Sequence, residues 1–141
     1  MSQIEDTELA LLVDGLMRRI HFGLQTRAPG FDRRAVGPMG GVVLLTLSDM
    51  GRTGLAELTR RVARDKSQMT RAVRSLETKE LVKREASPED GRVTDVYLTE
   101  DGEQVVRELI AAVTEVVSET LEPISAAEKQ TLKSLLKRIL S

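Results

Sequence analysis

Residues 81–98 read Leu81-Val82-Lys83-Arg84-Glu85-Ala86-Ser87-Pro88-Glu89-Asp90-Gly91-Arg92-Val93-Thr94-Asp95-Val96-Tyr97-Leu98, and this stretch decides the fold. Its two ends, residues 81–85 and 93–98, are strand candidates, because alternate side chains of such a segment share one face. Between them, Ser87-Pro88 and Asp90-Gly91 are dipeptides typical of turns. The stretch therefore predicts a β-hairpin, with residues 82–98 forming a wing that has a charged tip.

The residues before the hairpin predict a helix with one apolar and one polar side. Asp65 and Gln68 match a variant of the capping box, so the helix is expected over residues 65–79. At about 100° per residue, its inward side is aliphatic. The inward residues are Met69, Ala72, Val73 and Leu76. The outward side and its flanks carry hydroxyl, amide and guanidinium groups, on Ser67, Gln68, Thr70, Arg71, Arg74, Ser75 and Thr78.

The polar side of this helix has the chemistry of DNA recognition. Arginine can make bidentate contacts to guanine and glutamine can do so to adenine, while hydroxyl groups bind phosphates. After Asp65, no acidic residue occurs in this segment before Glu77. Ordinary solvated helix faces usually mix Glu with Lys, and such a face is the alternative interpretation.

A shorter helix is expected immediately upstream. Thr53 is a good N-cap for a helix over residues 54–62, and it is also counted among the candidate DNA contacts. Leu55, Leu58 and Val62 would face inward. A brief turn at Ala63-Arg64 then joins the two helices into a helix-turn-helix unit.

A hairpin after a helix-turn-helix is the layout of a winged helix. Arg92 at the tip would contact the DNA backbone or enter a narrow minor groove, with Lys83 and Arg84 on the neighbouring strand. Asp90 would be repelled by DNA, so we expect it to pair with a nearby arginine and support the wing. The alternative is an ordinary turn aspartate, which the Asp-Gly dipeptide favours.

Charge is distributed unevenly along the chain. The net charge is −1, but residues 52–84 contain ten basic and four acidic residues, a net of +6, and the rest of the chain carries −7. A basic middle between acidic ends suits a local surface for a polyanion, although a mixed solvated surface would also account for it.

Long helices are expected at both ends of the chain. Residues 5–27 carry an apolar stripe, and Ala28-Pro29-Gly30 follows as a helix end. A second helix is expected from Pro38 to about residue 47, with Gly40-Gly41 inside it. Thr99 would cap a helix that Pro123 breaks, and a capping box at residues 125–128 starts the last helix. The fold class is mainly α with a small β-hairpin wing (α+β).

Composition and motifs exclude several functions. The chain has no cysteine, which excludes disulfides, thiolate catalysis and cysteine-based zinc sites. The single histidine, His21, lacks an H-E-x-x-H context, so it is expected to be structural or exposed, or else to lie near an effector cavity. No catalytic motif appears. We therefore expect no enzyme, no metal and no cofactor.

The apolar stretches bear on where the protein acts. The longest one, near residues 42–47, is too short to span a membrane. The start of the chain lacks the pattern of a signal peptide. We expect a cytoplasmic protein that does not bind membranes.

The sequence resembles the MarR family of bacterial transcriptional regulators. The segment Asp90-Gly91-Arg92, followed by Leu98-Thr99 and Gly102, resembles the wing signature of the family. The paired helices of the family resemble Leu55-Ala56-Glu57-Leu58 together with residues 65–71 and Leu76, and Leu81-Val82-Lys83-Arg84 resembles the start of its wing. The resemblance extends over nearly the whole chain.

The resemblance implies a homodimer that binds a pseudo-palindromic DNA site, more often as a repressor, and that responds to a small phenolic or lipophilic effector. It implies a single domain over residues 1–141, with dimerisation helices at 5–27 and 100–140 around a winged helix-turn-helix at 37–99. The expected dimerisation residues are Leu9, Leu12, Leu16, Val113, Val117, Leu132, Leu135, Leu136 and Ile139. The periodicity agrees independently, because three long helices with broad apolar faces need more cover than the rest of the chain provides.

Two positions depart from the family pattern. Glu80 stands where the family often has a glycine that ends the recognition helix, so a left-handed conformation there would be strained by about 1 kcal/mol. Gly40-Gly41 stands where the family often has a bulky residue, and either close packing or room for a ligand would explain the pair. The other function that the sequence allows is a winged-helix adaptor that contacts proteins and has lost DNA binding.

Overall fold

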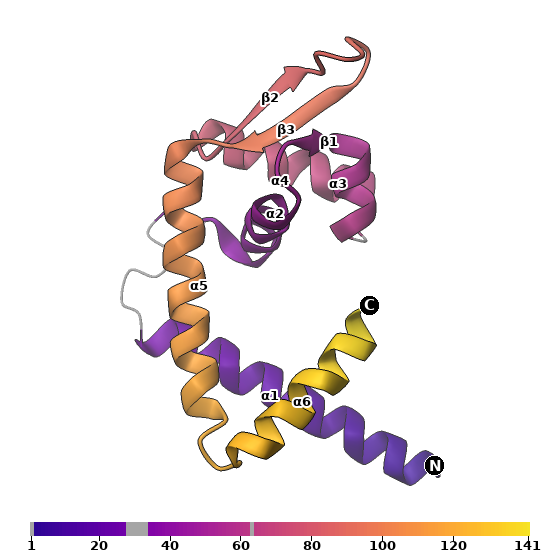
Figure 1. Cartoon of the computed structure of the whole chain (residues 1–141), viewed down its shortest axis with the longest axis vertical. Helices are drawn as coiled ribbons and strands as arrows, with labels where there is room; N and C mark the ends of the chain where they lie inside the picture. Colours follow the sequence, from indigo (N-terminus) through magenta and orange to yellow (C-terminus); the bar gives the residue numbers. More distant parts are fainter. Residues whose placement is uncertain (1, 28–33, 63) are drawn as a thin grey trace. The chain divides into compact units, whose positions relative to one another are not determined.

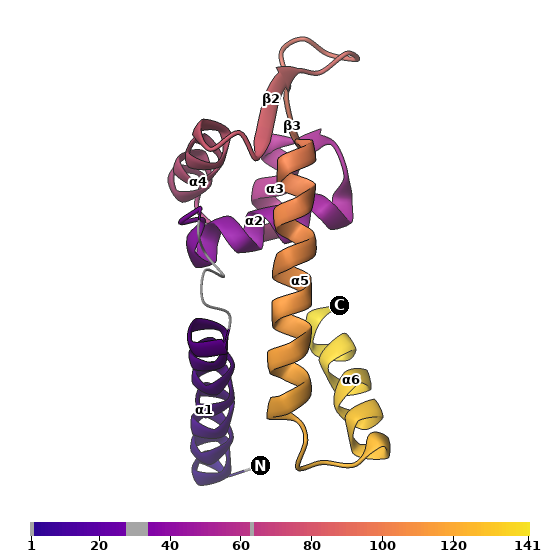
Figure 2. The ribbon, with the colours of Figure 1, turned by 90° about the vertical axis from the view of Figure 1, so that its left-hand side faces the viewer.

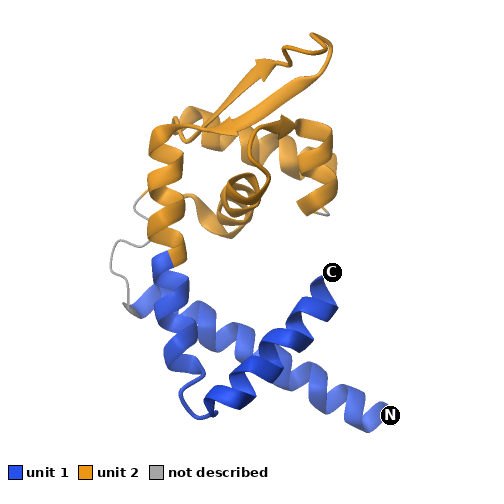
Figure 3. Cartoon of the chain, in the orientation of Figure 1, with its two compact units in different colours: residues 1–29, 111–141 blue, residues 30–110 orange. Residues whose placement is uncertain are grey.

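The computed structural model describes residues 2–27, 34–62 and 64–141. The helix end expected at Ala28-Pro29-Gly30 and the turn residue Ala63 lie outside these residues. The chain divides into two compact units, residues 1–29 with 111–141, and residues 30–110 (Figure 3). The expectation of one domain stays a prediction, because compactness alone does not decide whether the units fold independently.

The unit formed by residues 30–110 contains the expected helix-turn-helix and wing. Its elements, labelled in Figure 1, are α2 (Gly37–Met50), β1 (Thr53–Gly54), α3 (Leu55–Val62), α4 (Lys66–Thr78), β2 (Val82–Ala86), β3 (Thr94–Leu98) and the first half of α5 (Glu100–Thr120). Helix α2 packs against both α3 and α4, and α4 packs against β2. The mainly α fold with a small β wing is therefore confirmed.

The sheet has three strands in the order β1-β3-β2, all antiparallel, where the sequence predicted a hairpin of two. Thr53 pairs with Val96 in β1, and α3 starts only at Leu55. The prediction of Thr53 as the N-cap of a helix from residue 54 was therefore wrong. A strand of two residues has no periodicity of its own, and only its pairing with β3 makes it a strand.

The core of this unit is aliphatic. The inward residues predicted for α4, Met69, Val73 and Leu76, are buried, as is Leu58 of α3, while Leu55 and Val62 are partly buried against them. The other fully buried hydrophobic residues of the cluster are Val43, Leu44, Leu47, Leu81, Val82, Val96 and Val106. Helices α2, α3 and α4, the first half of α5 and the sheet therefore share one core.

Gly40 of α2 is buried by close packing. A Cβ atom there would lie 2.6 Å from Cγ1 of Val36 and 3.4 Å from Cδ2 of Leu76. A Cβ atom at the neighbouring Gly41 would make only an ordinary contact with Leu109, at 3.6 Å. Close packing therefore explains Gly40, while Gly41 has room for a side chain.

Helix α2 is longer than the sequence predicted. It continues past the expected end near residue 47 to Met50, which packs partly buried against the core. Gly51 then ends the helix with a φ of 73°, and its N–H donates to the carbonyl of Leu47 at 2.8 Å. A positive φ is strained for other residues, and glycine adopts it without strain.

The other unit consists of α1 (Gln3–Arg27), the second half of α5 and α6 (Ala126–Leu140). Gly23 of α1 lies against Val116 of α5, since a Cβ atom on Gly23 would come within 2.7 Å of Cγ1 of Val116. The predicted capping box at the start of α6 is confirmed, with Ser125 and Glu128 each binding the backbone N–H of the other. No helix in the described part of the chain is both long and apolar enough to cross a membrane.

Candidate nucleic-acid interface

Helix α4 presents its polar side to solvent, as the sequence predicted. Ser67, Gln68, Arg71, Arg74 and Ser75 are exposed, as is Thr78. Thr70 is half-buried, and its hydroxyl donates to the carbonyl of Lys66 at 2.8 Å. The exposed groups on this helix are therefore hydroxyl, amide and guanidinium groups. Their contact with DNA stays a prediction.

The start of α4 is fixed by its cap. The carboxylate of Asp65 accepts a hydrogen bond from the backbone N–H of Gln68 at 2.8 Å, as the sequence predicted. Such a cap stabilises the first turn by about 1 kcal/mol. The cap therefore orders the backbone that carries the side chains of Ser67 and Gln68.

The end of α4 is fixed by a strained residue. Glu80 has a φ of 61°, which confirms the left-handed conformation that the sequence raised for this position. Its N–H donates to the carbonyl of Glu77 at 2.9 Å, and the N–H of Leu81 donates to that of Leu76 at 3.0 Å. These two bonds form a Schellman motif, in which glycine is the usual residue. A side chain there costs about 1 kcal/mol.

The end of α4 is also tied to the start of α5. The hydroxyl of Thr99 donates to the carbonyl of Glu80 at 2.6 Å and accepts from the N–H of Gly102 at 3.0 Å. Gly102 has no room for a side chain, because a Cβ atom there would clash with the carbonyl oxygen of Leu81. The Leu98-Thr99 and Gly102 motif thus holds the start of α5 against Glu80 and Leu81, which follow α4.

Arg84 of β2 is not the free cation beside the wing tip that the sequence indicated, because it pairs with an acidic residue. Its Nε lies 3.1 and 3.2 Å from the two carboxylate oxygens of Glu77 in α4, and its Nη2 lies 2.8 Å from the first of them. The hydrogen bonds from Arg84 lower the pKa of Glu77, and the carboxylate raises the pKa of Arg84 in return. Glu77 is the one acidic residue in the second half of α4, and its charge is therefore neutralised by Arg84.

The wing tip is organised by its own hydrogen bonds. The N–H of Ser87 donates to the carbonyl of Val93 at 2.8 Å, and that of Val93 donates to the carbonyl of Asp90 at 2.9 Å. The carboxylate of Asp90 accepts from the backbone N–H of Arg92 at 3.1 Å and from its Nε at 3.2 Å. The side chain of Arg92 is 92% exposed. Asp90 thus contacts the arginine that it was predicted to support, although that role stays a prediction.

A cluster around Arg52 was not found from the sequence. Its Nε donates to Asp95 at 2.9 Å, its Nη1 lies 3.4 Å from Glu85, and its guanidinium lies 4.9 Å from the ring centroid of Tyr97. The hydroxyl of Tyr97 donates to Glu85 at 2.6 Å. The bond to Asp95 raises the pKa of Arg52, while the bond between Tyr97 and Glu85 lowers the pKa of Glu85 and raises that of Tyr97. The only signal in the sequence is that Asp95 and Tyr97 share one face of a strand.

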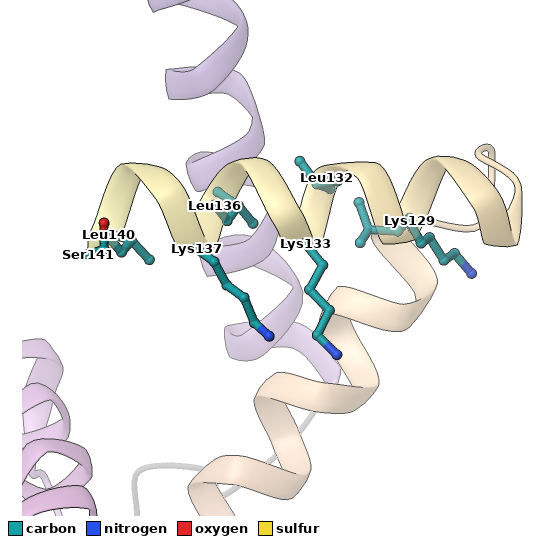
Figure 4. Close-up of a pocket in the computed structure, with 8 residues that line it drawn as sticks. Lys129, Leu132, Lys133, Leu136, Lys137, Leu140 and Ser141 are labelled. Atoms are coloured by element: carbon teal, nitrogen blue, oxygen red, sulfur yellow. The ribbon is translucent and has the colours of Figure 1, made fainter.

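The unit of α1 and α6 presents apolar side chains to solvent. Of the predicted dimerisation residues, Leu9, Leu12, Leu16, Leu135, Leu136 and Ile139 are exposed, and Val113, Val117 and Leu132 are half-buried. On α6, a groove is lined by Leu132, Leu136 and Leu140. Three lysines, at positions 129, 133 and 137, border it with side chains that extend from the helix (Figure 4). An apolar surface of this extent is typical of an interface.

His21 has a simple place in the structure. Its ring is exposed on α1, and its Nε2 lies 3.1 Å from the side-chain nitrogen of Gln25. Within residues 2–27, 34–62 and 64–141, no three side chains of histidine, aspartate or glutamate come together as metal ligands. Of the places that the sequence allowed for His21, the structure shows the exposed one.

Two short helices joined by a turn, with a hairpin that projects beyond them, define a winged helix-turn-helix protein (Figure 2). Residues 41–94 match the model of the MarR family. The chain is 30% identical over 94 residues to the HTH-type transcriptional repressor IacR of Pseudomonas putida, covering 67% of this chain and 56% of that one. The chain thus resembles the MarR family of winged-helix regulators, and the family model matches its helix-turn-helix and most of its wing over residues 41–94.

Solved structures share the fold over the whole length of the chain. A mutant of MarR from E. coli complexed with operator DNA superposes with a TM-score of 0.78, covers 100% of both chains and is 22% identical. BpsR of Bordetella bronchiseptica superposes with a TM-score of 0.77 at 23% identity, over 95% of this chain and 99% of BpsR. That structure concerns the regulation of its DNA binding by 6-hydroxynicotinic acid. At these identities the likeness establishes the fold. The chain spans about half the length of the curated relatives it matches, 51% and 56%.

Proposed function

We propose that the protein is a homodimeric transcriptional regulator that binds a pseudo-palindromic DNA site. The observation that carries the proposal is the exposed face of α4, which presents Gln68, Arg71 and Arg74. Asp65 caps the start of the helix, and Arg84 binds the carboxylate of Glu77. Helix α4 reads base edges in the major groove, and Arg92 at the wing tip contacts the backbone or the minor groove.

The dimer uses the unit that contains α1 and α6. A monomer would leave Leu12, Ile139 and Leu140 64%, 73% and 81% exposed, which is unfavourable for isolated leucine and isoleucine side chains gathered on helices. A second copy buries these faces and places two α4 helices on one DNA duplex. The half-sites are then about one helical turn apart, as in other dimers with this motif.

Binding of a small molecule controls the affinity for DNA. The repressor IacR supports repression, and the regulation of BpsR by 6-hydroxynicotinic acid supports a small aromatic effector. We propose an effector of small phenolic or lipophilic character. The effector acts by shifting the population of dimers between DNA-binding and non-binding forms. A differential affinity of a few kcal/mol is enough for release. The protein has no catalytic activity and acts in the cytoplasm, where its operator lies.

The experiment is competition binding to the DNA upstream of the gene. A labelled intergenic duplex is titrated with the protein at several salt concentrations, in the presence of bulk genomic DNA. The proposal expects the intergenic duplex to outcompete bulk DNA, with an affinity that falls steeply as salt rises. Equal weak binding to every duplex contradicts it. A stable dimer without DNA binding favours instead an adaptor that contacts proteins.

A further inference from the structure

The wing becomes narrower on the way to its tip. Strand β1 pairs with only two residues of β3, Val96 and Asp95. Beyond the pair Glu85 and Asp95, the two arms of the wing are connected by the pair Ala86 and Thr94 and by the bond from the Ser87 N–H to the Val93 carbonyl. The outer part of the wing, which carries Arg92, is therefore a two-stranded ribbon. Such ribbons are marginally stable alone, so the position of the tip depends on side chains at its base.

Arg52 lies at the point where the third strand ends. It comes directly before β1, and it reaches across to both other strands, binding Asp95 of β3 at 2.9 Å and lying 3.4 Å from Glu85 of β2. Those two carboxylates stand opposite each other in the register of the sheet. One guanidinium therefore contacts the last pair that three strands support.

Tyr97 completes the cluster. Its ring lies under the Arg52 guanidinium, with 4.9 Å between the guanidinium carbon and the ring centroid. Its hydroxyl donates to Glu85 at 2.6 Å, across the diagonal from β3 to β2. Diagonal neighbours in a sheet are within reach of aromatic and long side chains. The guanidinium of Arg52 thus stacks on the ring of Tyr97, while Asp95 and Glu85 contact two of its nitrogen atoms.

The charges of the cluster explain why an arginine is needed there. Glu85 and Asp95 would repel each other at adjacent positions and would both repel a DNA backbone. The side chain of Asp95 is only 14% exposed, so its charge requires a partner. A lysine supplies a point charge without the planar fork, and it cannot contact both carboxylates while stacked on a ring.

We propose that Arg52 is a positioning residue for the wing, which fixes the outer ribbon so that Arg92 meets the DNA. The proposal rests on the proposed function, since it names a residue that acts on DNA through another. Arg52 does not itself contact DNA in this account. Its loss weakens binding only because the wing tip is no longer held in place.

The test is a double-mutant cycle of Arg52→Lys with Arg92→Ala, measured as affinity for the preferred duplex. Arg52→Lys keeps the charge, so general attraction to DNA is unchanged. We expect it to weaken binding about threefold to tenfold, which lies within the range for residues that are energetically coupled. In the Arg92→Ala background, the same change is expected to alter affinity less than about twofold, because the tip contact is already lost.

The matched control is Arg107→Lys, another arginine of the same unit, whose guanidinium donates to the side-chain oxygen of Gln104. It is expected to leave DNA affinity unchanged. An Arg52→Lys effect of equal size in both backgrounds contradicts the proposal, because it would not act through the tip. No effect in either background contradicts it as well.

Hydrogen exchange in the protein without DNA separates this proposal from the proposed function. The backbone amides of residues 86–94 are expected to exchange faster in Arg52→Lys than in the wild type, whether or not DNA binds. Unchanged exchange there overturns the positioning role even if the wild type binds its operator. If Arg52→Lys does not fold, Tyr97→Phe takes its place, since it removes only the bond to Glu85.

Discussion

Arg84 of β2 holds the carboxylate of Glu77 in α4 with both oxygens engaged, and this pair joins the helix proposed to read DNA to the base of the wing. Both side chains are about one-third exposed, at 31% and 35%. A bidentate pair fixes orientation as well as distance. The helix and the wing are therefore held at one mutual angle, which suits two elements that would contact adjacent parts of one duplex.

Replacement of the Glu77 carboxylate tests the stability that this pair provides. Because Arg84 lowers the pKa of Glu77 in the folded protein, the pair stabilises the fold above the ordinary pKa of glutamate and stops doing so as pH falls through the lowered pKa. Denaturant unfolding of the wild type and Glu77→Gln is expected to differ most at about pH 6 and to converge at about pH 2.

The control for this prediction is Glu89→Gln, an exposed glutamate in the turn of the wing. It is expected to leave the stability of the fold unchanged across the same pH range, because exposed charges away from a fixed partner contribute little. A gap between wild type and Glu77→Gln that stays constant with pH would show that packing, and not charge, accounts for the difference.

Truncation of Arg71 is expected to change which DNA sequences are preferred. If Arg71 contacts a base edge, Arg71→Ala costs about 1–3 kcal/mol on the preferred duplex and relaxes the choice of base at one position in each half-site. The measurement is binding to a set of duplexes in which each position of the site is changed in turn. Uniform weakening over all duplexes would place Arg71 on the phosphates instead.

Arg92→Ala is the companion variant for that experiment. Its side chain is 92% exposed on the wing tip, where it would contact phosphate or read the width of the minor groove. It is expected to weaken all duplexes by similar factors and to reduce the slope of affinity against salt by about 1. If neither variant changes affinity, α4 and the wing are not the DNA-contacting elements.

Glycine at position 80 is expected to stabilise the protein. Glu80 has a φ of 61°, so Glu80→Gly removes a steric cost of about 1 kcal/mol at the end of α4. Thr78→Gly, at the last residue of α4, replaces a residue without a positive φ, so it is expected to destabilise by about a few tenths of a kcal/mol and serves as the matched control. Destabilisation by both variants would mean that the Glu80 side chain makes a contact worth more than the strain.

A charge in the apolar surface of α6 is expected to dissociate the dimer. Ile139 is 73% exposed in one chain, and Ile139→Asp would bury a carboxylate in the interface of two. Sedimentation at several concentrations is expected to show dimers for the wild type and mostly monomers for the variant. Thr131→Asp, on the same helix but outside the predicted dimerisation set, is expected to stay dimeric. A monomeric wild type would contradict the dimer itself.

The sequence predicted the parts of the fold that local patterns encode. Periodicity identified the buried side of α4, and short motifs identified its Asp65 cap and the Ser125 capping box. The left-handed Glu80 was raised by the resemblance to the MarR family, in which a glycine often ends this helix. Each of these features depends on residues within a few positions of one another.

The features that the sequence did not predict depend on residues far apart in the chain. Strand β1 exists only because Thr53 and Gly54 pair with β3, about 40 residues later. Arg84 looked like a free cation of the wing until the fold placed Glu77 beside it, and Arg52 meets Asp95 only in the folded sheet. A charged residue in a sequence gives no sign of which opposite charge will neutralise it.

A footprint on the DNA adjacent to the gene tests the central claim most directly. The account predicts that the wild-type protein protects a pseudo-palindromic site whose two half-site centres are about one helical turn apart, at concentrations that leave bulk DNA unprotected. It also predicts that Arg71→Ala loses this protection under the same conditions. Weak, uniform protection along the whole fragment, equal for the wild type and the variant, would contradict the account.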